Sequence, residues 1–345
     1  MNPLDYIDDD DEQVENESID LIHLTIPASN RGERLDKVLA KLLPEYSRSR
    51  LQTWLEKGYV VNQHKVMKVK DSVLGGEELR ISVPEDPQVE AFSPENIDLD
   101  IVYHDESIAV INKPVGMVVH PGAGNWGRTL LNGLLYHFPE CSLVPRAGIV
   151  HRLDKDTSGL LVVAKNLTSQ THLVRQLQSR TVLRRYLALV WGKVPPEKII
   201  HGSIGRDPRD RLKMAVISSG KPAVTHMKQM GFVKYGAATA SLVTCKLETG
   251  RTHQIRVHME SIGHPLINDP VYKKGTPTDW GALRNSVGIE YSQGIGQALH
   301  AAVLGLEHPN SGKWMEWRVS PPLSFMRWLD ELKFDFDLSN EINRL

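Results

Sequence analysis

The stretch His151-Arg-Leu-Asp-Lys-Asp-Thr-Ser-Gly-Leu-Leu-Val-Val-Ala164 decides the fold of this chain. Its second half, from Leu160 to Ala164, is a short apolar run entered through Thr-Ser-Gly, a pattern that predicts a buried core strand. Its first half is a charged loop in which Asp154 stands between Arg152 and Lys155. A loop fixed to a core strand can present a reactive group, although an Asp in a charged loop is commonly only a turn former. Both interpretations of Asp154 stay open on this stretch alone.

The composition is that of a globular protein, with 41% apolar and 24% charged residues. A length of 345 residues allows two domains. No apolar run is long enough to span a membrane, and the acidic N-terminus resembles neither a secretory signal nor a transit peptide. Cys141 and Cys245 form no CxxC pair, which fits a reducing cytoplasm and gives no support for a zinc site. We therefore expect a cytoplasmic protein without a membrane segment.

The net charge of −1 hides two regions of opposite sign. Nine of the 42 acidic residues lie within residues 1–20, which contain no Lys or Arg, so 33 acidic residues face 41 basic residues in the rest. A positively charged body fits a polyanionic partner. We expect residues 1–21 to form a disordered acidic tail, because like charges repel and little there can be buried. Competition between this tail and RNA for the basic surface is the alternative.

Residues 22–84 are predicted to form a small RNA-binding module. A weak alternation from Ile22 to Ile26 indicates a short strand. A helical pattern follows from Arg34 until Pro44, and a second helix begins at Ser47 as its N-cap. The outward face of the second helix is basic, and short strands are expected at residues 59–62 and 78–83. Two short helices with a basic face beside a small sheet suit the binding of RNA.

A Pro-punctuated linker over residues 85–97 is predicted to lead into a larger domain of residues 98–335, followed by a C-terminal tail of residues 336–345. Apolar runs predict strands at residues 100–103, 108–113, 159–164, 186–191 and 241–247. Helical patterns cover residues 129–138, 167–179 and 252–262. Several strands with few helices between them predict an α+β fold with a mixed sheet.

Four further segments share the polar, Gly-rich and basic character of the first stretch: residues 112–122, 184–186, 206–222 and 248–258. Each could also be ordinary surface charge, and residues 206–222 look like a turn-rich excursion. His253 and His258 are five residues apart and do not lie on one helix face, and no HExxH pattern exists, so we expect no metal site. Ser158 lacks the GxSxG elbow of a nucleophilic serine and is expected to serve a turn.

Five of these motifs together resemble those of the RluA-type RNA pseudouridine synthases. They are HRLDKDTSGLLVVAK, LRRYLALVWG, GKPAVTH, LETGRTHQIRVHM and ALHA. The N-terminal module resembles an S4 RNA-binding domain through RLDKVLA, SRSRLQ and VVN, and the resemblance extends from about Ile22 to Asp335. It implies a mainly antiparallel sheet flanked by helices, and an enzyme that isomerises uridine in RNA without a cofactor.

The resemblance also implies roles for individual residues. Asp154 is the expected catalytic aspartate, Arg256 the arginine that pairs with it, and Tyr186 the tyrosine that packs against uracil. Arg152 is placed to contact RNA and to help hold the target base outside its stack. Further RNA contacts are expected from basic residues of the motifs, turns and N-terminal module: Arg48, Arg50, Lys113, Arg206, Arg211, Lys213, Arg251 and His253.

The target that the resemblance implies is large-subunit ribosomal RNA, with uridines in the stem-loop of helix 69 as the expected site, acted on by a monomer. A synthase for transfer RNA or another RNA would carry the same core motifs. A catalytically silent RNA-binding or ribosome-assembly factor is the alternative from another class, and an RNA glycosidase is disfavoured by the lack of a paired carboxylate. Asn268-Asp269, where the family usually has Gly-Asp, and the turn of residues 124–128 depart from the pattern and leave the RNA target open.

Overall fold

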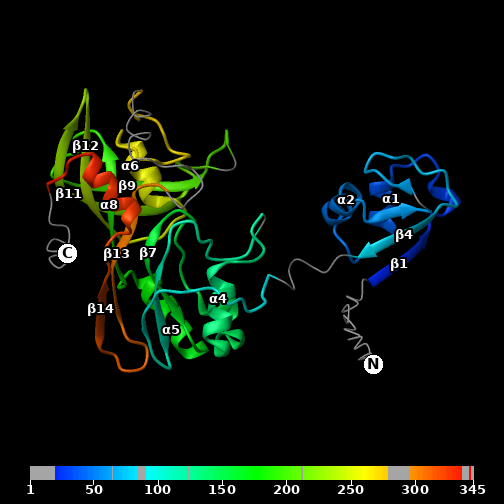
Figure 1. Cartoon of the computed structure of the whole chain (residues 1–345), viewed down its shortest axis with the longest axis horizontal. Helices are drawn as coiled ribbons and strands as arrows, with labels where there is room; N and C mark the ends of the chain where they lie inside the picture. The colour runs from blue at the N-terminus through cyan, green and yellow to red at the C-terminus, as the bar shows by residue number, and fades with distance from the viewer. Residues whose placement is uncertain are drawn as a thin grey trace, which may run out of the picture. The chain divides into compact units, whose positions relative to one another are not determined.

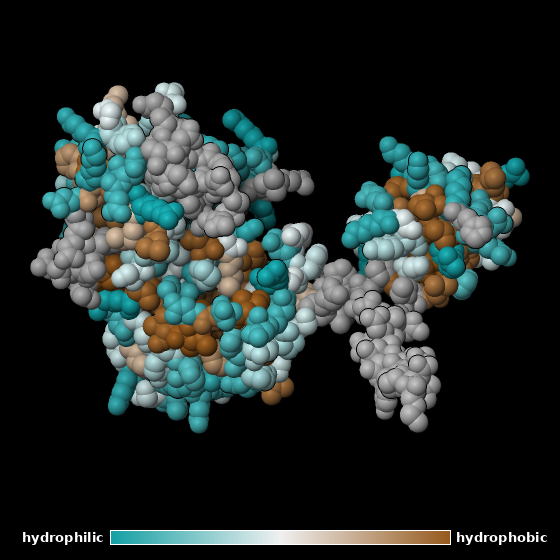
Figure 2. All heavy atoms as spheres, in the orientation of Figure 1, coloured by the Kyte–Doolittle hydropathy of each residue, from teal (hydrophilic) through white to brown (hydrophobic). Residues whose placement is uncertain are grey.

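The computed structural model describes residues 20–63, 65–83, 91–122, 124–210, 213–278, 296–335 and 342. The chain divides into two compact units, residues 1–89 and residues 90–345 (Figure 1). Hydrophilic residues dominate the visible surface of each unit, with smaller hydrophobic groups between them (Figure 2). Within the described ranges, no helix combines the length and the apolar character that crossing a bilayer requires.

The first unit is a small antiparallel sheet with two helices. Its sheet has the order β1-β4-β2-β3, and its elements are β1 (Asp20–Thr25), η1 (Ala28–Asn30), α1 (Leu35–Leu42), α2 (Arg48–Glu56), β2 (Val60–Asn62), β3 (Lys65–Val66) and β4 (Glu78–Val83). Leu39 of α1, Trp54 of α2 and Ile81 of β4 are buried in one apolar core. Ser47 accepts a hydrogen bond from the Arg50 amide and caps α2, as predicted.

A buried carboxylate ties the two helices of this unit together. Asp36 on α1 accepts hydrogen bonds from Arg34, from Arg48 on α2 at 2.6 Å and from Gln52 at 2.7 Å. Burial alone would raise the pKa of Asp36, but these donors outweigh it and hold the pKa well below its ordinary value. The Arg48 guanidinium, which we expected to contact RNA, is therefore already engaged in the helix packing of this unit.

The second unit is built on a ten-stranded sheet. The strand order is β10-β9-β11-β12-β8-β13-β7-β6-β5, and β14 pairs with β13 off this path. The strands are β5 (Ile101–His104), β6 (Ile108–Lys113), β7 (Ser158–Ala164), β8 (Leu183–Trp191), β9 (Glu197–Arg206), β10 (Met214–Val216), β11 (Lys221–Tyr235), β12 (Ala238–Leu247), β13 (Leu299–Glu307) and β14 (Trp314–Arg318). The pairing is antiparallel except between β7 and β13. The predicted α+β class with a mixed, mainly antiparallel sheet is confirmed.

Helices cover both faces of the sheet around β7 and β8. They are α4 (Leu130–His137), α5 (Leu167–Ser179), α6 (Gln254–Ser261) and α8 (Leu323–Glu331), with the short turns η2 (Pro139–Leu143) and η3 (Pro145–Gly148) after α4. Leu161 and Val163 of β7 pack with α4 and α6, whereas Leu160 and Val162 pack on the other face with Leu173 of α5. Because both faces are covered, β7 is apolar at every position instead of alternating, which explains its sequence.

Some element boundaries differ from those predicted. Residues 91–97, predicted as linker, belong to the second unit, because Ala91 is buried and Asn132 donates to its carbonyl oxygen. The excursion at residues 206–222 contains β10 and the start of the 15-residue β11, so it is not a turn-rich loop throughout. The tails lie outside the described residues, apart from Asp20 and Leu21 in β1 and the buried Ile342.

Gly159 allows the one parallel strand pair to form. It has a φ of 108°, and a Cβ atom there would lie 2.3 Å from the Ala301 oxygen of β13 and 2.6 Å from the Ala301 nitrogen. The hydroxyl of the neighbouring Ser158 on β7 is 2.9 Å from Nδ1 of the buried His300 on β13. Only glycine permits this approach of β7 to β13. The Thr-Ser-Gly entry is therefore a packing requirement as well as a turn.

We expect Gly159→Ala to destabilise the protein by about 2–3 kcal/mol, because the added methyl group overlaps the β13 backbone. Gly236→Ala is the matched control, since Gly236 has a φ of 57° but a Cβ there meets no atom within 4 Å. It should cost only the left-handed backbone strain, about 1 kcal/mol. Urea unfolding followed by circular dichroism measures both changes. Equal costs for the two variants would contradict the packing explanation.

Candidate active site

A cavity of about 610 Å³ opens where three predicted motifs meet. Its lining includes Asp154 from the loop before β7, Tyr186 from β8, and Arg256 from the first turn of α6. Strands β7, β13, β8 and β12 are consecutive in the sheet, so the loop before β7 and the connection from β12 to α6 reach the same region. The volume lies in the range of small-molecule pockets and suits a single extruded nucleotide.

Arg256 holds Asp154 from one side and a second carboxylate from the other. Its Nη1 donates to Asp154 Oδ2 at 2.9 Å, while Nε and Nη2 donate to the two oxygens of Asp269 at 2.7 and 3.0 Å. Burial opposes the charge of Arg256, but Asp269 and Asp154 together raise its pKa above the ordinary value. A guanidinium shared in this way fixes the direction in which Asp154 points.

The Asp269 carboxylate is fully engaged. Its side chain has no exposed surface, and its Oδ1 also accepts hydrogen bonds from the amides of Val271 and Tyr272 at 2.8 and 3.0 Å. Asp154 differs, since 17% of its side chain is exposed in the cavity and only its Oδ2 receives a hydrogen bond from Arg256. Of these two carboxylates, Asp154 is the one that can react with a substrate.

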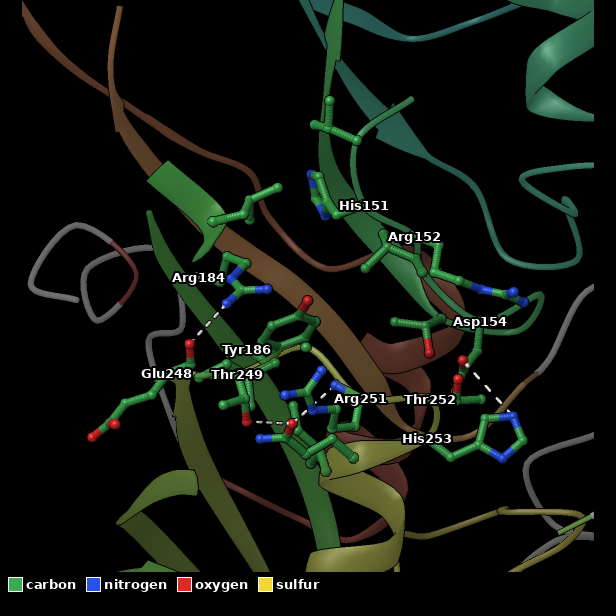
Figure 3. Close-up of a pocket in the computed structure, with 18 of the residues that line it drawn as sticks. His151, Arg152, Asp154, Arg184, Tyr186, Glu248, Thr249, Arg251, Thr252 and His253 are labelled. Atoms are coloured by element: carbon green, nitrogen blue, oxygen red, sulfur yellow. Dashed lines mark hydrogen bonds and ion pairs between the residues drawn. The ribbon is translucent and has the colours of Figure 1, made fainter. Parts of the chain in front are cut away.

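His253 lies beside Asp154 on the opposite side from Tyr186 (Figure 3). Its Nε2 is 3.9 Å from Asp154 Oδ1, and its Nδ1 is 2.8 Å from the Tyr272 hydroxyl. Burial lowers the pKa of His253 below its ordinary value, and the Asp154 carboxylate opposes this only in part. A neutral imidazole here can donate or accept a hydrogen bond, but it does not neutralise Asp154.

Tyr186 and Arg184 project from the same face of β8, since they are two residues apart in a strand. Both line the cavity, and each is only 6% exposed. Burial raises the pKa of the Tyr186 phenol, so the ring is neutral at physiological pH. Figure 3 shows Tyr186 facing the cavity across from Asp154. This side chain therefore offers an aromatic surface within the pocket.

Lys113 differs from our expectation of an RNA contact. Its side chain is completely buried, and its ammonium donates to the carbonyl oxygens of Pro114, Met117 and Lys155 at 2.7, 2.9 and 3.0 Å. Burial lowers the pKa of Lys113 to about 7, with partial opposition from Asp156 and Asp154. Because all three of its donors are occupied by backbone, Lys113 positions the loop that carries Asp154 and is not available to RNA.

The remaining basic candidates lie in different places. Arg152 and Arg251 are exposed at the cavity, where Arg251 also donates to the Pro222 carbonyl oxygen. Arg206 ends β9 and Lys213 precedes β10, and neither lines the cavity. Arg206 and Lys213 therefore belong to the same unit as the site, but the structure does not place them in the cavity with Asp154.

Two candidates of the basic list remain. In the first unit, the Arg50 guanidinium lies 5.4 Å from the ring centres of both Tyr46 and Trp54. Arg211 lies outside the described residues. RNA contacts by these two side chains remain predictions.

Asp269 was not predicted as a site residue, although Asn268 before it stands where the family usually has Gly. Asn268 has a φ of 59°, a left-handed conformation that glycine and asparagine tolerate better than other residues. The change from Gly to Asn therefore preserves the turn that presents Asp269 to Arg256. The polar pair Asn268-Asp269 after α6 was the only signal in the sequence. The spacing along the chain did not show that Asp269 pairs with Arg256.

The connection between β12 and α6 is held by Gln254. Its Oε1 accepts hydrogen bonds from the Thr249 hydroxyl at 2.7 Å and the Arg251 amide at 3.0 Å, while its Nε2 donates to the Val224 oxygen at 3.0 Å. His258 is buried, and its Nδ1 is 2.9 Å from the Thr225 hydroxyl, whereas His253 contacts Tyr272. Among the described residues, no group of three or more His, Cys, Asp or Glu side chains is arranged to hold a metal ion.

Residues 107–261 match the RNA pseudouridylate synthase family, and residues 33–79 match the S4 domain. The chain is 50% identical to the ribosomal large subunit pseudouridine synthase D of Neisseria meningitidis serogroup B (strain MC58), over 99% of this chain and 90% of that relative. This chain belongs to the RNA pseudouridine synthase family. A second relative, the enzyme of the same name from Escherichia coli strain K12, is 45% identical over 91% of this chain and 94% of the relative.

A solved structure supports the same assignment. The human RNA pseudouridylate synthase domain containing 1 protein superposes with a TM-score of 0.51 at 25% identity, covering 76% of this chain and 98% of the other. The protein is thus an RNA pseudouridine synthase, an isomerase that carries an S4 domain ahead of its catalytic unit.

We expect Arg256→Lys in this synthase to lower the rate of a single turnover by on the order of 10²-fold, because an ammonium cannot hold Asp154 and chelate Asp269 at once. RNA affinity should stay nearly unchanged, since the side chain is 5% exposed. Arg318→Lys is the control, as Arg318 is exposed on β14, forms an ion pair with Glu316 and does not line the cavity. Equal rates for the two variants would show that Asp154 needs no such support.

Proposed function

We propose that this synthase converts uridines of large-subunit ribosomal RNA to pseudouridine, with the stem-loop of helix 69 as its target and Asp154 as its catalytic residue. The observation that carries the proposal is the 2.9 Å hydrogen bond by which buried Arg256 directs Asp154 into a cavity shared with Tyr186. Extrusion of the target uridine into such a pocket costs a few kcal/mol, which contacts to RNA outside the pocket must offset.

The chemistry needs one carboxylate. Asp154 either attacks the ribose C1′ as the bond to N1 breaks, or removes a proton from C2′ to leave an unsaturated sugar. The freed uracil then rotates, and C5 bonds to C1′ as the Asp154–C1′ bond breaks or as Asp154 returns the proton to C2′. The C5 proton leaves and N1 takes up a proton, so nothing is gained or lost overall. Tyr186 supplies the surface against which the ring packs, and Arg256 fixes the direction of Asp154.

The engaged state of Asp269 favours isomerisation over hydrolysis. Glycosidases use a second carboxylate to protonate the leaving group or to activate water. Asp269 is separated from Asp154 by the Arg256 guanidinium and accepts four hydrogen bonds. Because its side chain has no exposed surface and does not line the cavity, Asp269 is not placed to activate water there, and the glycosidase alternative loses support.

Three observations support ribosomal RNA as the substrate. The relatives from Neisseria meningitidis and Escherichia coli carry the name ribosomal large subunit pseudouridine synthase D and match nearly the full chain. An S4 domain precedes the catalytic unit. Outside residues 1–20 the chain carries 41 basic against 33 acidic residues, which suits a phosphate-rich partner.

Phosphate contacts would come from exposed cations of the catalytic unit. Arg152 and Arg251 lie at the cavity, and Arg206 and Lys213 lie in the β9–β10 region. Contacts of this kind position the RNA without reading its bases.

We expect Asp154→Asn to reduce pseudouridine formation in a helix 69 stem-loop transcript by at least on the order of 10⁴-fold, because the amide can neither attack C1′ nor accept a proton. Asp156→Asn is the matched control. Asp156 lies two residues further along the same loop but does not line the cavity. The purified proteins are assayed by mapping pseudouridine in the transcript after a single turnover.

The same variants decide the target in cells. Pseudouridine is mapped across all RNA in strains that carry the wild type, a deletion or Asp154→Asn. Loss of sites in helix 69 supports the proposal, whereas loss confined to transfer RNA overturns the ribosomal target. Full RNA binding without product from the wild-type protein, on any transcript, would instead indicate a silent RNA-binding factor.

A further inference from the structure

Arg184 is a buried cation of the cavity that the mechanism above does not use. It lies on β8 two residues before Tyr186, is 6% exposed and lines the same cavity. Figure 3 shows Arg184 and Tyr186 on one side of the cavity, with Asp154 and His253 on the other. A base that packs against Tyr186 would therefore have Arg184 beside its edge.

The hydrogen bonds of Arg184 leave its charge uncompensated. Its Nη2 donates to the Glu248 main-chain oxygen at 3.3 Å, and its buried Nε meets no acceptor among the described residues. The Glu248 carboxylate is turned elsewhere, to His226 at 2.6 Å and Arg180 at 3.2 Å. Within the described part of the chain, no carboxylate lies within ion-pair distance of Arg184.

The free-energy cost of burying the Arg184 guanidinium without a carboxylate partner indicates that Arg184 binds a ligand. A buried charge without a partner destabilises a folded protein, and natural sequences usually neutralise or replace it. Arg256 shows the ordinary solution in the same cavity, with two carboxylates around one guanidinium.

The neighbouring backbone also makes room for the Arg184 side chain. A Cβ atom at Gly250 would lie 2.7 Å from Arg184 Nη1, so the glycine of the motif Glu-Thr-Gly-Arg leaves the space that the guanidinium occupies. The pocket is thus shaped around a cation that lacks an anion.

We propose that Arg184 donates hydrogen bonds to the uracil carbonyl oxygens and stabilises the negative charge that the base acquires when its bond to ribose breaks. This inference rests on the proposed uridine isomerisation. When C1′–N1 breaks, the electron pair passes to N1 and is shared with O2 and O4 of the ring. Ribose C1′ bonds to the Asp154 carboxylate or C2′ loses a proton to it. The charge on uracil disappears when C5 bonds to C1′, as the Asp154–C1′ bond breaks or the proton returns to C2′, and C5 then loses a proton while N1 gains one.

Burial favours the base over a phosphate as the partner of Arg184. The phosphates of an extruded nucleotide stay with the RNA backbone at the mouth of the pocket, where Arg152 and Arg146 are exposed. Arg184 is instead almost completely enclosed beside the tyrosine. A fixed cation in a site that excludes water stabilises developing charge much more than it would in solvent.

The test compares Arg184→Met, Arg184→Lys and Arg185→Met in the full chain. Arg185 is the matched control, because it is the next residue of β8, points to the opposite face and does not line the cavity. Single-turnover rates on a helix 69 stem-loop transcript should fall on the order of 10²–10³-fold in Arg184→Met, as for loss of one charge-stabilising donor. Arg184→Lys should retain more activity than Arg184→Met, and Arg185→Met should match the wild type. The Kd for the transcript should be nearly unchanged in all three.

A second substrate separates charge stabilisation from a structural role. In 6-azauridine a ring nitrogen withdraws electrons and makes the departing base a more stable anion. The rate loss of Arg184→Met, measured as loss of the N1-linked base, should shrink by on the order of tenfold with this nucleotide. If Arg184→Met does not fold, Arg184→Lys is compared on the two substrates in its place.

Three results would overturn the inference. They are a variant as fast as the wild type, a rate loss that is the same for uridine and 6-azauridine, and a rate loss explained entirely by weaker RNA binding. In each of these the wild type still forms pseudouridine, so the proposed function stands. A wild-type protein that forms none in any RNA removes the proposed function and this inference with it.

Discussion

The cavity of the catalytic unit depends on the guanidinium of Arg256, which is shared between the carboxylates of Asp154 and Asp269. Asp269 takes two of its nitrogens and is itself held by two backbone amides, so the arginine cannot rotate away. The remaining nitrogen donates to Asp154 Oδ2, and the other oxygen, Oδ1, lies 3.9 Å from Nε2 of His253. Buried ion pairs of this kind add little net stability, and their value here is the fixed direction of one carboxylate.

The loop that carries Asp154 is rigid because both of its ends are attached to the core. At its N-terminal side, Nε2 of His151 accepts a hydrogen bond from the Val162 amide, and directly after Asp154 the Lys113 ammonium donates to the Lys155 carbonyl oxygen. At its C-terminal side, Gly159 lets β7 approach β13 so closely that a methyl group would not fit. A reacting group that must meet C1′ within a few tenths of an ångström needs supports of this sort, because small displacements cost large factors in rate.

The local pattern of the sequence predicted β7 and the loop before it, since an apolar run behind Thr-Ser-Gly has few other interpretations. The roles of Asp154, Tyr186 and Arg256 came from resemblance, and the structure brings all three to one cavity. Lys113 could not be placed from sequence, because a lysine at a strand end is ordinarily exposed and its buried acceptor on Lys155 is 42 positions away. The long β11 was likewise not predicted from the sequence, because Gly220 just before it and Pro222 near its start are typical of a turn.

Two buried arginines in one cavity indicate how the work of bond cleavage is divided. The charge of Arg256 is compensated by the carboxylates of Asp154 and Asp269. In the proposed reaction, Arg256 orients Asp154 on the sugar side. Arg184 lies across the cavity with its charge unmatched among the described residues, on the side where Tyr186 would receive the base. Breaking C1′–N1 creates positive character on the sugar and negative character on the base. A site with a carboxylate at one end and an uncompensated guanidinium at the other is complementary to that separated charge, and therefore to the transition state more than to the neutral uridine.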